Sequence, residues 1–204
     1  MGLFRRNSVN PVAASAEEHG WRYAGSNDAL AYLANHEPFT GAHHPGAYDV
    51  VRGEIDGHQF TAFLLQSEDT TWDSDGDMYT NNINHMIVTI PTPGSPHSLE
   101  ITPTGHFGGV KRALTAHKVT FESQAFNDEF IVSAKDPRFA HAVLHAQNIQ
   151  RMLDDPRKPL PLWFERDLLM TWKQTRLKVD EIEPRVRYLI DNLAPIPPSA
   201  WEID

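Results

Sequence analysis

The stretch from Val119 to Asp136 has the sequence VTFESQAFNDEFIVSAKD. Apolar residues alternate with polar ones on both sides of its centre, at Val119, Phe121, Phe130 and Val132. Alternation with a period of two is typical of half-buried strands, and Asn127 lies in a short run of turn formers. The stretch therefore predicts a strand, a turn at residues 126–128, a second strand and the start of a helix at Asp136.

Apolar residues then recur at steps of three and four, at Phe139, Ala142, Val143, Ala146, Ile149 and Leu153. This spacing predicts one amphipathic helix over residues 136–154, with Asp136 as its N-cap. A second long helix is predicted over residues 181–193, where Asp180 and Glu183 have the spacing of a capping box. Both helices lie in the C-terminal part of the chain.

The chain upstream of Val119 predicts two short helices and then a series of strands with few helices between them. Strands are predicted over residues 48–52 and 54–65, which are either separated at Gly53 or paired about Asp56-Gly57, a strong hairpin signal. A later hairpin is predicted across Arg166-Asp167. Strands that follow one another without crossover helices favour an α+β fold, with a mainly antiparallel sheet packed against the two longer C-terminal helices and the short N-terminal ones.

The composition is that of a globular protein without cysteine chemistry. The 204 residues are 40% hydrophobic, and a chain of this length can bury roughly 70% of its unfolded surface. We expect residues 1–11 to be flexible and residues 12–204 to form a single domain, with two packed halves (12–118 and 119–204) as the alternative. The absence of cysteine excludes disulfides and thiolate metal sites.

The charge and the apolar runs restrict the class of partner. A formal net charge of −9 disfavours binding to nucleic acid, whose phosphate backbone it would repel. No apolar run reaches the roughly 18 residues that a membrane span requires, so no transmembrane segment is expected. We predict a cytoplasmic protein, with peripheral contact at the inner membrane face as an open alternative.

Three groups of landmarks resemble those of a known group of proteins. They are Gly20-Trp21, the Pro38-Phe39-x-Gly41 motif, and the motif Glu122-Ser123-x-x-Phe126-Asn127-x-x-Phe130-x-Val132. In order and spacing the chain is similar to an uncharacterised actinobacterial family that is described as a domain of unknown function. The resemblance implies an α+β protein, and it implies no catalytic residues, because that family has no assigned activity.

Two candidate metal sites can be proposed from spacing. Asp73, Asp75 and Asp77 alternate as in the first half of a calcium-binding loop, but the glycine and the closing glutamate of that motif are missing. His141 and His145 are four residues apart on the helix predicted over residues 136–154, so both could face one zinc ion. A solvated loop and two surface histidines are the favoured interpretations.

The remaining candidates are histidines in or next to loops: His43, His44, His58 and His106. A histidine can act as a general base near neutral pH, although no nucleophile motif accompanies these four. We therefore favour a non-catalytic interaction module that binds a protein or a small ligand, and no cofactor is predicted. The exposed end of the sheet near the acidic segment 67–84 is the expected partner surface. The alternative is a histidine- or metal-dependent hydrolase, and a homo-oligomer is a further possibility.

Overall fold

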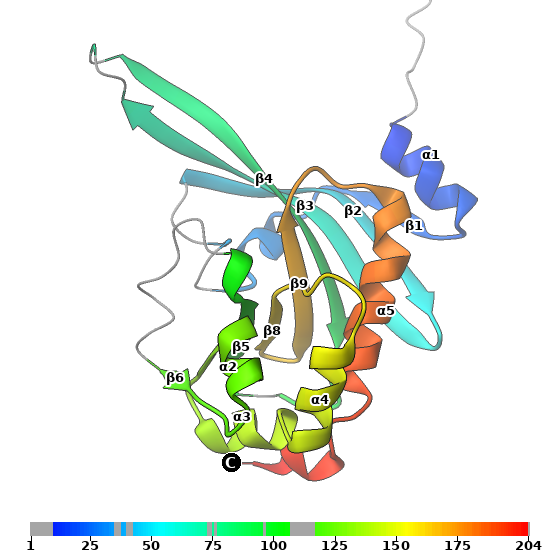
Figure 1. The fold of residues 1–204 in the computed structure, drawn as a ribbon. Helices are drawn as coiled ribbons and strands as arrows, with labels where there is room; N and C mark the ends of the chain where they lie inside the picture. The colour runs from blue at the N-terminus through cyan, green and yellow to red at the C-terminus, as the bar shows by residue number, and fades with distance from the viewer. Residues whose placement is uncertain are drawn as a thin grey trace, which may run out of the picture.

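The computed structural model describes residues 10–34, 38–39, 43–72, 75, 77–95, 97–106 and 117–203, with the backbone alone for residues 43, 44, 70 and 106. Most of the expected flexible N-terminus, Asp73 and Gly41 lie outside the described residues. The described chain forms one large antiparallel sheet, and its longer helices lie on one face of that sheet (Figure 1). The α+β prediction is therefore confirmed.

Nine strands of the described residues make up the sheet, in the order β1-β2-β3-β4-β9-β8-β5-β7-β6. Every neighbouring pair is antiparallel. Strands from residues 12–118 and 119–204 interleave, because β9 and β8 lie between β4 and β5. The strands are β1 Arg22–Gly25, β2 His43–Ile55, β3 His58–Trp72, β4 Met78–Pro91, β5 Leu99–Pro103, β6 Lys118–Val119, β7 Phe130–Ala134, β8 Leu162–Glu165 and β9 Leu168–Gln174.

Two of the predicted hairpins are confirmed by backbone geometry. Asp56 and Gly57 connect β2 to β3 with φ values of 50° and 79°, which is the left-handed conformation that a tight two-residue turn requires. Arg166, with φ 58°, turns β8 into β9. The acidic segment 67–84 extends both strands of the β3–β4 hairpin, which pair from Ser67 and Ile83 to Trp72 and Met78.

The helical elements are α1 Pro11–Glu18, α2 Gln124–Glu129, α3 Pro137–Val143, α4 Ala146–Asp154 and α5 Ile182–Leu193, with 3-10 turns η1 Asp28–Tyr32, η2 Thr104–His106, η3 Val179–Glu181 and η4 Pro198–Glu202. The prediction of one helix over residues 136–154 is wrong, because the chain becomes extended at His145 between α3 and α4. The buried Asn148 donates its side-chain amide to the carbonyl oxygen of Val143 at 2.8 Å. That bond satisfies a carbonyl at the C-terminal end of α3, and a new helix starts one turn later.

The stretch from Val119 to Asp136 contains the end of β6, the helix α2 and the strand β7. The predicted turn at residues 126–128 is instead part of α2, which Ser123 caps by accepting a hydrogen bond from the amide of Phe126. Asn127 ties this helix to the segment before it, because its side chain bonds both backbone groups of Phe121, at 3.0 Å and 2.6 Å. Asn127, predicted in a turn, thus lies in a helix and bonds the backbone of the segment before it.

The N-terminal end of α5 also differs from its prediction. Glu181 is the N-cap residue and makes no side-chain capping bond there, so the expected capping box at Asp180 and Glu183 is wrong. The carboxylate of Glu181 instead binds Arg185 at 2.6 Å and Lys178 at 2.9 Å. Ion pairs along the helix surface thus replace the capping interaction that the spacing suggested.

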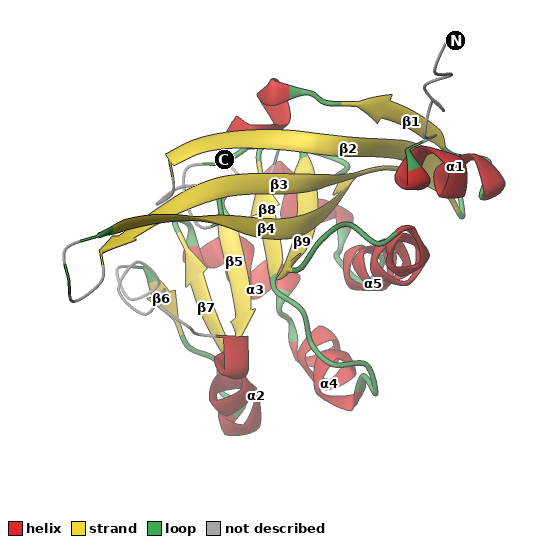
Figure 2. Ribbon diagram, turned by 90° about the horizontal axis from the view of Figure 1, so that it is seen from above, coloured by secondary structure: helices red, strands yellow, loops and turns green. Residues whose placement is uncertain are grey.

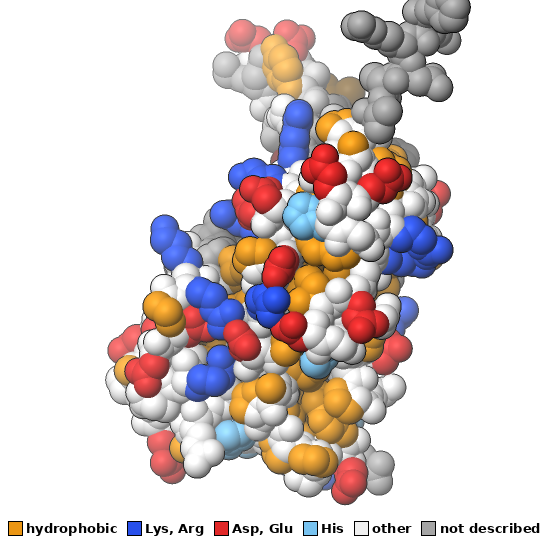
Figure 3. Space-filling model, turned by 90° about the vertical axis from the view of Figure 1, so that its right-hand side faces the viewer, with side chains coloured by type: hydrophobic (Ala, Val, Ile, Leu, Met, Phe, Trp, Pro, Cys, Tyr) orange, Lys and Arg blue, Asp and Glu red, His pale blue; other side chains and the backbone are white. Residues whose placement is uncertain are grey.

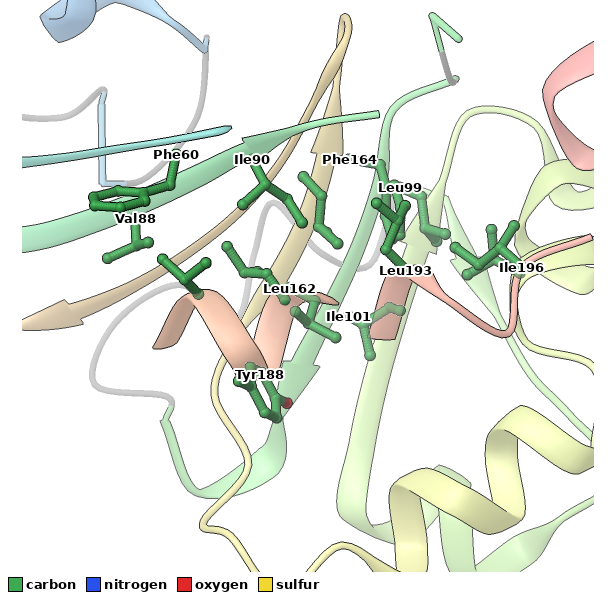
Figure 4. Close-up of a cluster of buried hydrophobic side chains, with 14 of the residues drawn as sticks. Phe60, Val88, Ile90, Leu99, Ile101, Leu162, Phe164, Tyr188, Leu193 and Ile196 are labelled. Carbon is green, nitrogen blue, oxygen red and sulfur yellow. The ribbon is translucent and has the colours of Figure 1, made fainter. Parts of the chain in front are cut away.

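The two faces of the sheet carry separate cores. One face packs against the longer helices, and Figure 2 shows α2, α4 and α5 on the same side of the sheet. The core on this face contains side chains from β3, β4, β5, β8 and α5 (Figure 4). The opposite face packs against η1 through Ala31 and contains Phe63, Leu65 and Trp163. Because successive residues of β3 point to opposite faces, Phe60 and Ala62 lie in the first core while Phe63 and Leu65 lie in the second.

Candidate functional site

The candidate histidines of β2 and β3 lie far apart. His43 and His44 open β2, whereas His58 opens β3 and pairs with Ile55 at the other end of β2. An extended strand rises about 3.3 Å per residue, so His43 and His58 are separated by roughly 40 Å along β2. His58 Nδ1 lies 3.0 Å from the carbonyl oxygen of Asp56, within its own turn. His106 closes η2, and its side chain is outside the described residues, as are those of His43 and His44.

The histidine pair proposed for zinc does not share a helix face. His141 lies in α3 and is exposed, with its ring edge-on to Phe121 at 5.0 Å. His145 is the N-cap residue of α4, and its Nε2 lies 3.1 Å from the carbonyl oxygen of Pro195. The helix break between α3 and α4 removes the i, i+4 geometry on which this site was based.

The acidic candidates lie at the turn of the β3–β4 hairpin. Asp75 and Asp77 fall in the connection between the two strands, and Asp73 is outside the described residues. Over the part of the chain whose positions are described, no three histidine, aspartate or glutamate side chains gather closely enough to hold a metal ion. Among the described residues, the structure therefore places no further ligand beside either candidate metal site.

A network of ion pairs joins α4, the linker to β8 and α5. Arg157 binds Asp155 at 2.6 Å and Asp191 at 2.8 Å, and its guanidinium lies 5.1 Å from the ring centre of Tyr188. The paired carboxylates raise the pKa of Arg157, and the Arg157 guanidinium lowers the pKa of Asp155. Burial raises the pKa of Tyr188 to about 12. All three shifts favour the usual charge states of these groups, a charged Arg157, an ionised Asp155 and a neutral Tyr188.

Hollows surround this network on the helix face. One of them has a volume of about 860 Å³ and is lined by Arg151, Asp154, Asp155, Pro156, Arg157, Asp191, Ala194 and Pro195. A smaller one of about 190 Å³ lies beside Arg185. Acidic and basic side chains intermingle over the face drawn in Figure 3, and Arg157 is matched by carboxylates at hydrogen-bond distance. We interpret this network as a structural clamp between α4 and α5.

Two titratable residues with strongly shifted pKa values lie on the opposite face of the sheet, and sequence reasoning missed both. Burial raises the pKa of Glu100 from 4.5 to about 7, against the opposing effect of a hydrogen bond from Thr102. Burial lowers the pKa of His85 from 6.5 to about 4, and its Nδ1 has no hydrogen-bond partner among the described atoms. Glu100 is on β5 and His85 on β4, with β9 and β8 between them, so they do not form a pair. For Glu100, the only feature of the sequence that could have indicated burial is its position between the apolar residues Leu99 and Ile101.

The most distinctive surface is the end of the β3–β4 hairpin, which projects beyond the other strands (Figure 1). We define this end, residues 69–72 and 78–84, as the arm. On its inner side β3 pairs with β4 in an unbroken register from Thr61 to Trp72, whereas β2 pairs with β3 only as far as Glu68. Among the described strands, the arm is therefore two-stranded from Asp69 to Trp72 and from Met78 to Asn81.

Large apolar side chains are exposed on this arm. Trp72 is 69% exposed, Met78 60% and Tyr79 51%. Trp72 and Met78 are directly paired across the two strands, so they share one face, while Tyr79 lies on the other. Exposed apolar side chains grouped on one projection are typical of surfaces that contact another molecule.

The outer backbone edge of β4 is also open along the arm. β9 pairs with β4 from His85 to Pro91, and no strand in the described ranges pairs with the outer edge of Met78–Asn84. Natural sheets commonly protect such edges with charged residues, proline or bulges. Met78–Asn84 contains no charged residue and no proline, and its register with β3 is regular. This edge can accept the backbone hydrogen bonds of a further strand.

Comparison with known proteins identifies a shared fold and no family. No family model matches the sequence, and no curated protein matches it. Within the described residues, no helix has the length and apolar character needed to cross a membrane. The fold is similar to the crystal structure of the mycobacterial trehalose monomycolate transport factor A, TtfA, with a TM-score of 0.60 and 12% identity over 92% of this chain and 94% of that chain. At this identity the likeness shows the fold alone, and the resemblance to an actinobacterial family stays a prediction.

Proposed function

We propose that this protein is a non-catalytic interaction module and that the arm binds another protein chain. The observation that carries the proposal is the combination of exposed Trp72, Met78 and Tyr79 with the open edge of β4. An added strand gains backbone hydrogen bonds along such an edge, and apolar side chains on both faces provide contact area and specificity.

The remaining geometry supports this class of function over the hydrolase alternative. His43 begins β2, His58 pairs with Ile55 at the other end of that strand, and the ion-pair network around Arg157 has its charges matched internally. The neighbour of similar fold is named as a transport factor, and we propose by analogy an accessory role in a process carried out with other proteins. We further propose a cytoplasmic location, motivated by the absence of cysteine, which fractionation of the native host would test.

Site-specific photocrosslinking tests the role of the arm. A photoreactive phenylalanine analogue is placed at Tyr79 in the full chain, and in a control variant at Tyr32 of η1, a tyrosine that is at least as exposed. We expect protein adducts from position 79 in native-host cells and few from position 32. Replacing Trp72 and Met78 with serine should reduce the adducts at position 79 without changing the fold. Absence of adducts above background at position 79 would refute the proposal.

A further inference from the structure

The open edge of β4 has a sequence that is complementary to itself. Met78–Asn84 reads Met-Tyr-Thr-Asn-Asn-Ile-Asn, with Asn81 at its centre. If two copies pair antiparallel so that all open residues take part, Asn81 faces Asn81 of the second copy and Tyr79 faces its Ile83. Pairs of an aromatic and a β-branched residue are among the favourable cross-strand pairs. The symmetric arrangement contains two such pairs.

Other symmetric registers use the edge less well. Shifting the centre from Asn81 to Asn82 would require pairing at His85, whose outer edge is already bonded to Gln174 of β9. Shifting the centre to Thr80 would leave Ile83 opposite Asp77, in the connection before β4, and would leave Asn84 beyond the paired strands. The register centred on Asn81 therefore uses the full open edge and keeps both Tyr79–Ile83 contacts.

Charge does not oppose this pairing directly. The edge itself is uncharged, and the nearest acid on the same level is Asp69, which pairs with Asn81 on the inner side of β4. In a four-stranded arm the two Asp69 residues would be three strand spacings apart, about 14 Å. That separation exceeds the Debye length of about 8 Å at physiological salt, so their repulsion is weak. The projection of the arm also keeps the acidic bodies of the two copies apart.

We propose that the partner bound by the arm is a second copy of this chain, through antiparallel pairing of the two β4 edges about a two-fold axis at Asn81. This inference rests on the proposed function and specifies its partner. The contact is isologous and closed, as in most homodimers. The contact uses only residues 78–84 of each copy, against the roughly 20–30 residues a side of a standard interface, so the dimer is weak and its population depends on protein concentration.

Cysteine crosslinking tests the register in the full chain, which has no cysteine of its own. Asn81→Cys would place two thiols opposite each other, with Cβ atoms about 5 Å apart, within reach of a disulfide. We expect a disulfide-linked dimer under mild oxidation. The matched control is Asp69→Cys, on the neighbouring strand, which should form at least tenfold less dimer. Equal crosslinking of the two variants would overturn the proposed pairing.

Charge substitution at the same position provides an independent test. Asn81→Asp and Asn81→Lys each place like charges opposite one another, so each variant alone should sediment as a monomer. An equimolar mixture should restore the dimer, because opposite charges then meet at the axis. Failure of the mixture to dimerise, together with a monomeric wild-type chain at high concentration, would refute self-pairing. In that case, adducts from position 79 to a different protein would leave the proposed function intact, and their absence would remove both.

Discussion

Replacement of Glu100 by glutamine should change how the stability of the protein depends on pH. Glu100 is half-buried on β5, where its Oε1 accepts a hydrogen bond from Thr102 at 3.1 Å. Burial raises its pKa from 4.5 to about 7. As pH rises through this window, the unfolded chain releases the proton before the folded chain does, so the free energy of unfolding falls. The stabilising contribution is fully present below about pH 4.5 and is lost by about pH 7.

The size of the effect follows from the two pKa values. A difference of about 2.5 pH units, at about 1.4 kcal/mol per unit, gives roughly 3 kcal/mol. Glutamine keeps the acceptor oxygen for Thr102 and cannot ionise. We therefore expect Glu100→Gln to match the wild type near pH 4.5 and to be more stable by roughly 3 kcal/mol above pH 8.

The pKa of His85 is shifted in the opposite direction, so its contribution to stability changes with pH in the opposite sense to that of Glu100. Its pKa is lowered from 6.5 to about 4, so its contribution is present above pH 6.5 and is lost as pH falls toward 4. In the wild type the contributions of Glu100 and His85 largely cancel between these limits. In the Glu100→Gln variant, acidification over the same range should lower stability by roughly 3 kcal/mol through His85 alone.

Urea unfolding followed by tryptophan fluorescence across this pH range measures the difference. The matched control is Glu122→Gln, an exposed glutamate before α2, which should change stability by less than about 0.5 kcal/mol at any pH. A constant difference in unfolding free energy between Glu100→Gln and the wild type, from about pH 4.5 to pH 8, would refute the assignment of the shifted pKa to Glu100.

Three further substitutions test the packing. Gly53→Ala should lower the unfolding free energy by about 1–3 kcal/mol, because an added Cβ would lie 2.5 Å from Cδ1 of Trp21; thermal denaturation measures the loss. Asn127→Ala removes the amide that bonds both backbone groups of Phe121, and urea unfolding should show a loss of about 1–3 kcal/mol, whereas a loss below 0.3 kcal/mol would contradict its role. Trp72→Ser should leave the free energy of unfolding unchanged within about 0.5 kcal/mol in urea denaturation, because this side chain is exposed; a large loss would contradict that exposure.

The stability tests and the binding tests are independent of each other. Glu100, Gly53 and Asn127 lie within the folded body, whereas the binding variants lie on the arm at Trp72 and Asn81. A variant of the arm that loses its partner while keeping the unfolding transition of the wild type would separate recognition from folding. That separation is what we expect if the exposed apolar side chains serve an interaction.

The sequence by itself determined the elements whose causes are local. Asp56-Gly57 makes a tight turn because glycine and aspartate tolerate positive φ, and α5 follows the spacing of its apolar residues. The α+β class followed from the order of these elements. The participation of Asn127 in local backbone bonds was also predictable, because asparagine side chains commonly bond neighbouring backbone groups.

The tertiary structure decided what depends on contacts between distant segments. The break between α3 and α4 involves Asn148, whose side chain is also held by Arg151, and Arg151 in turn binds Asn192 of α5 at 2.6 Å. The pKa of Glu100 depends on which face of the sheet is covered. The open edge at Met78–Asn84 exists because β9 pairs with β4 only from His85 onward. The periodicity of one segment does not indicate where a neighbouring strand ends or which side chain a distant helix contributes. These features are therefore visible only in the folded structure.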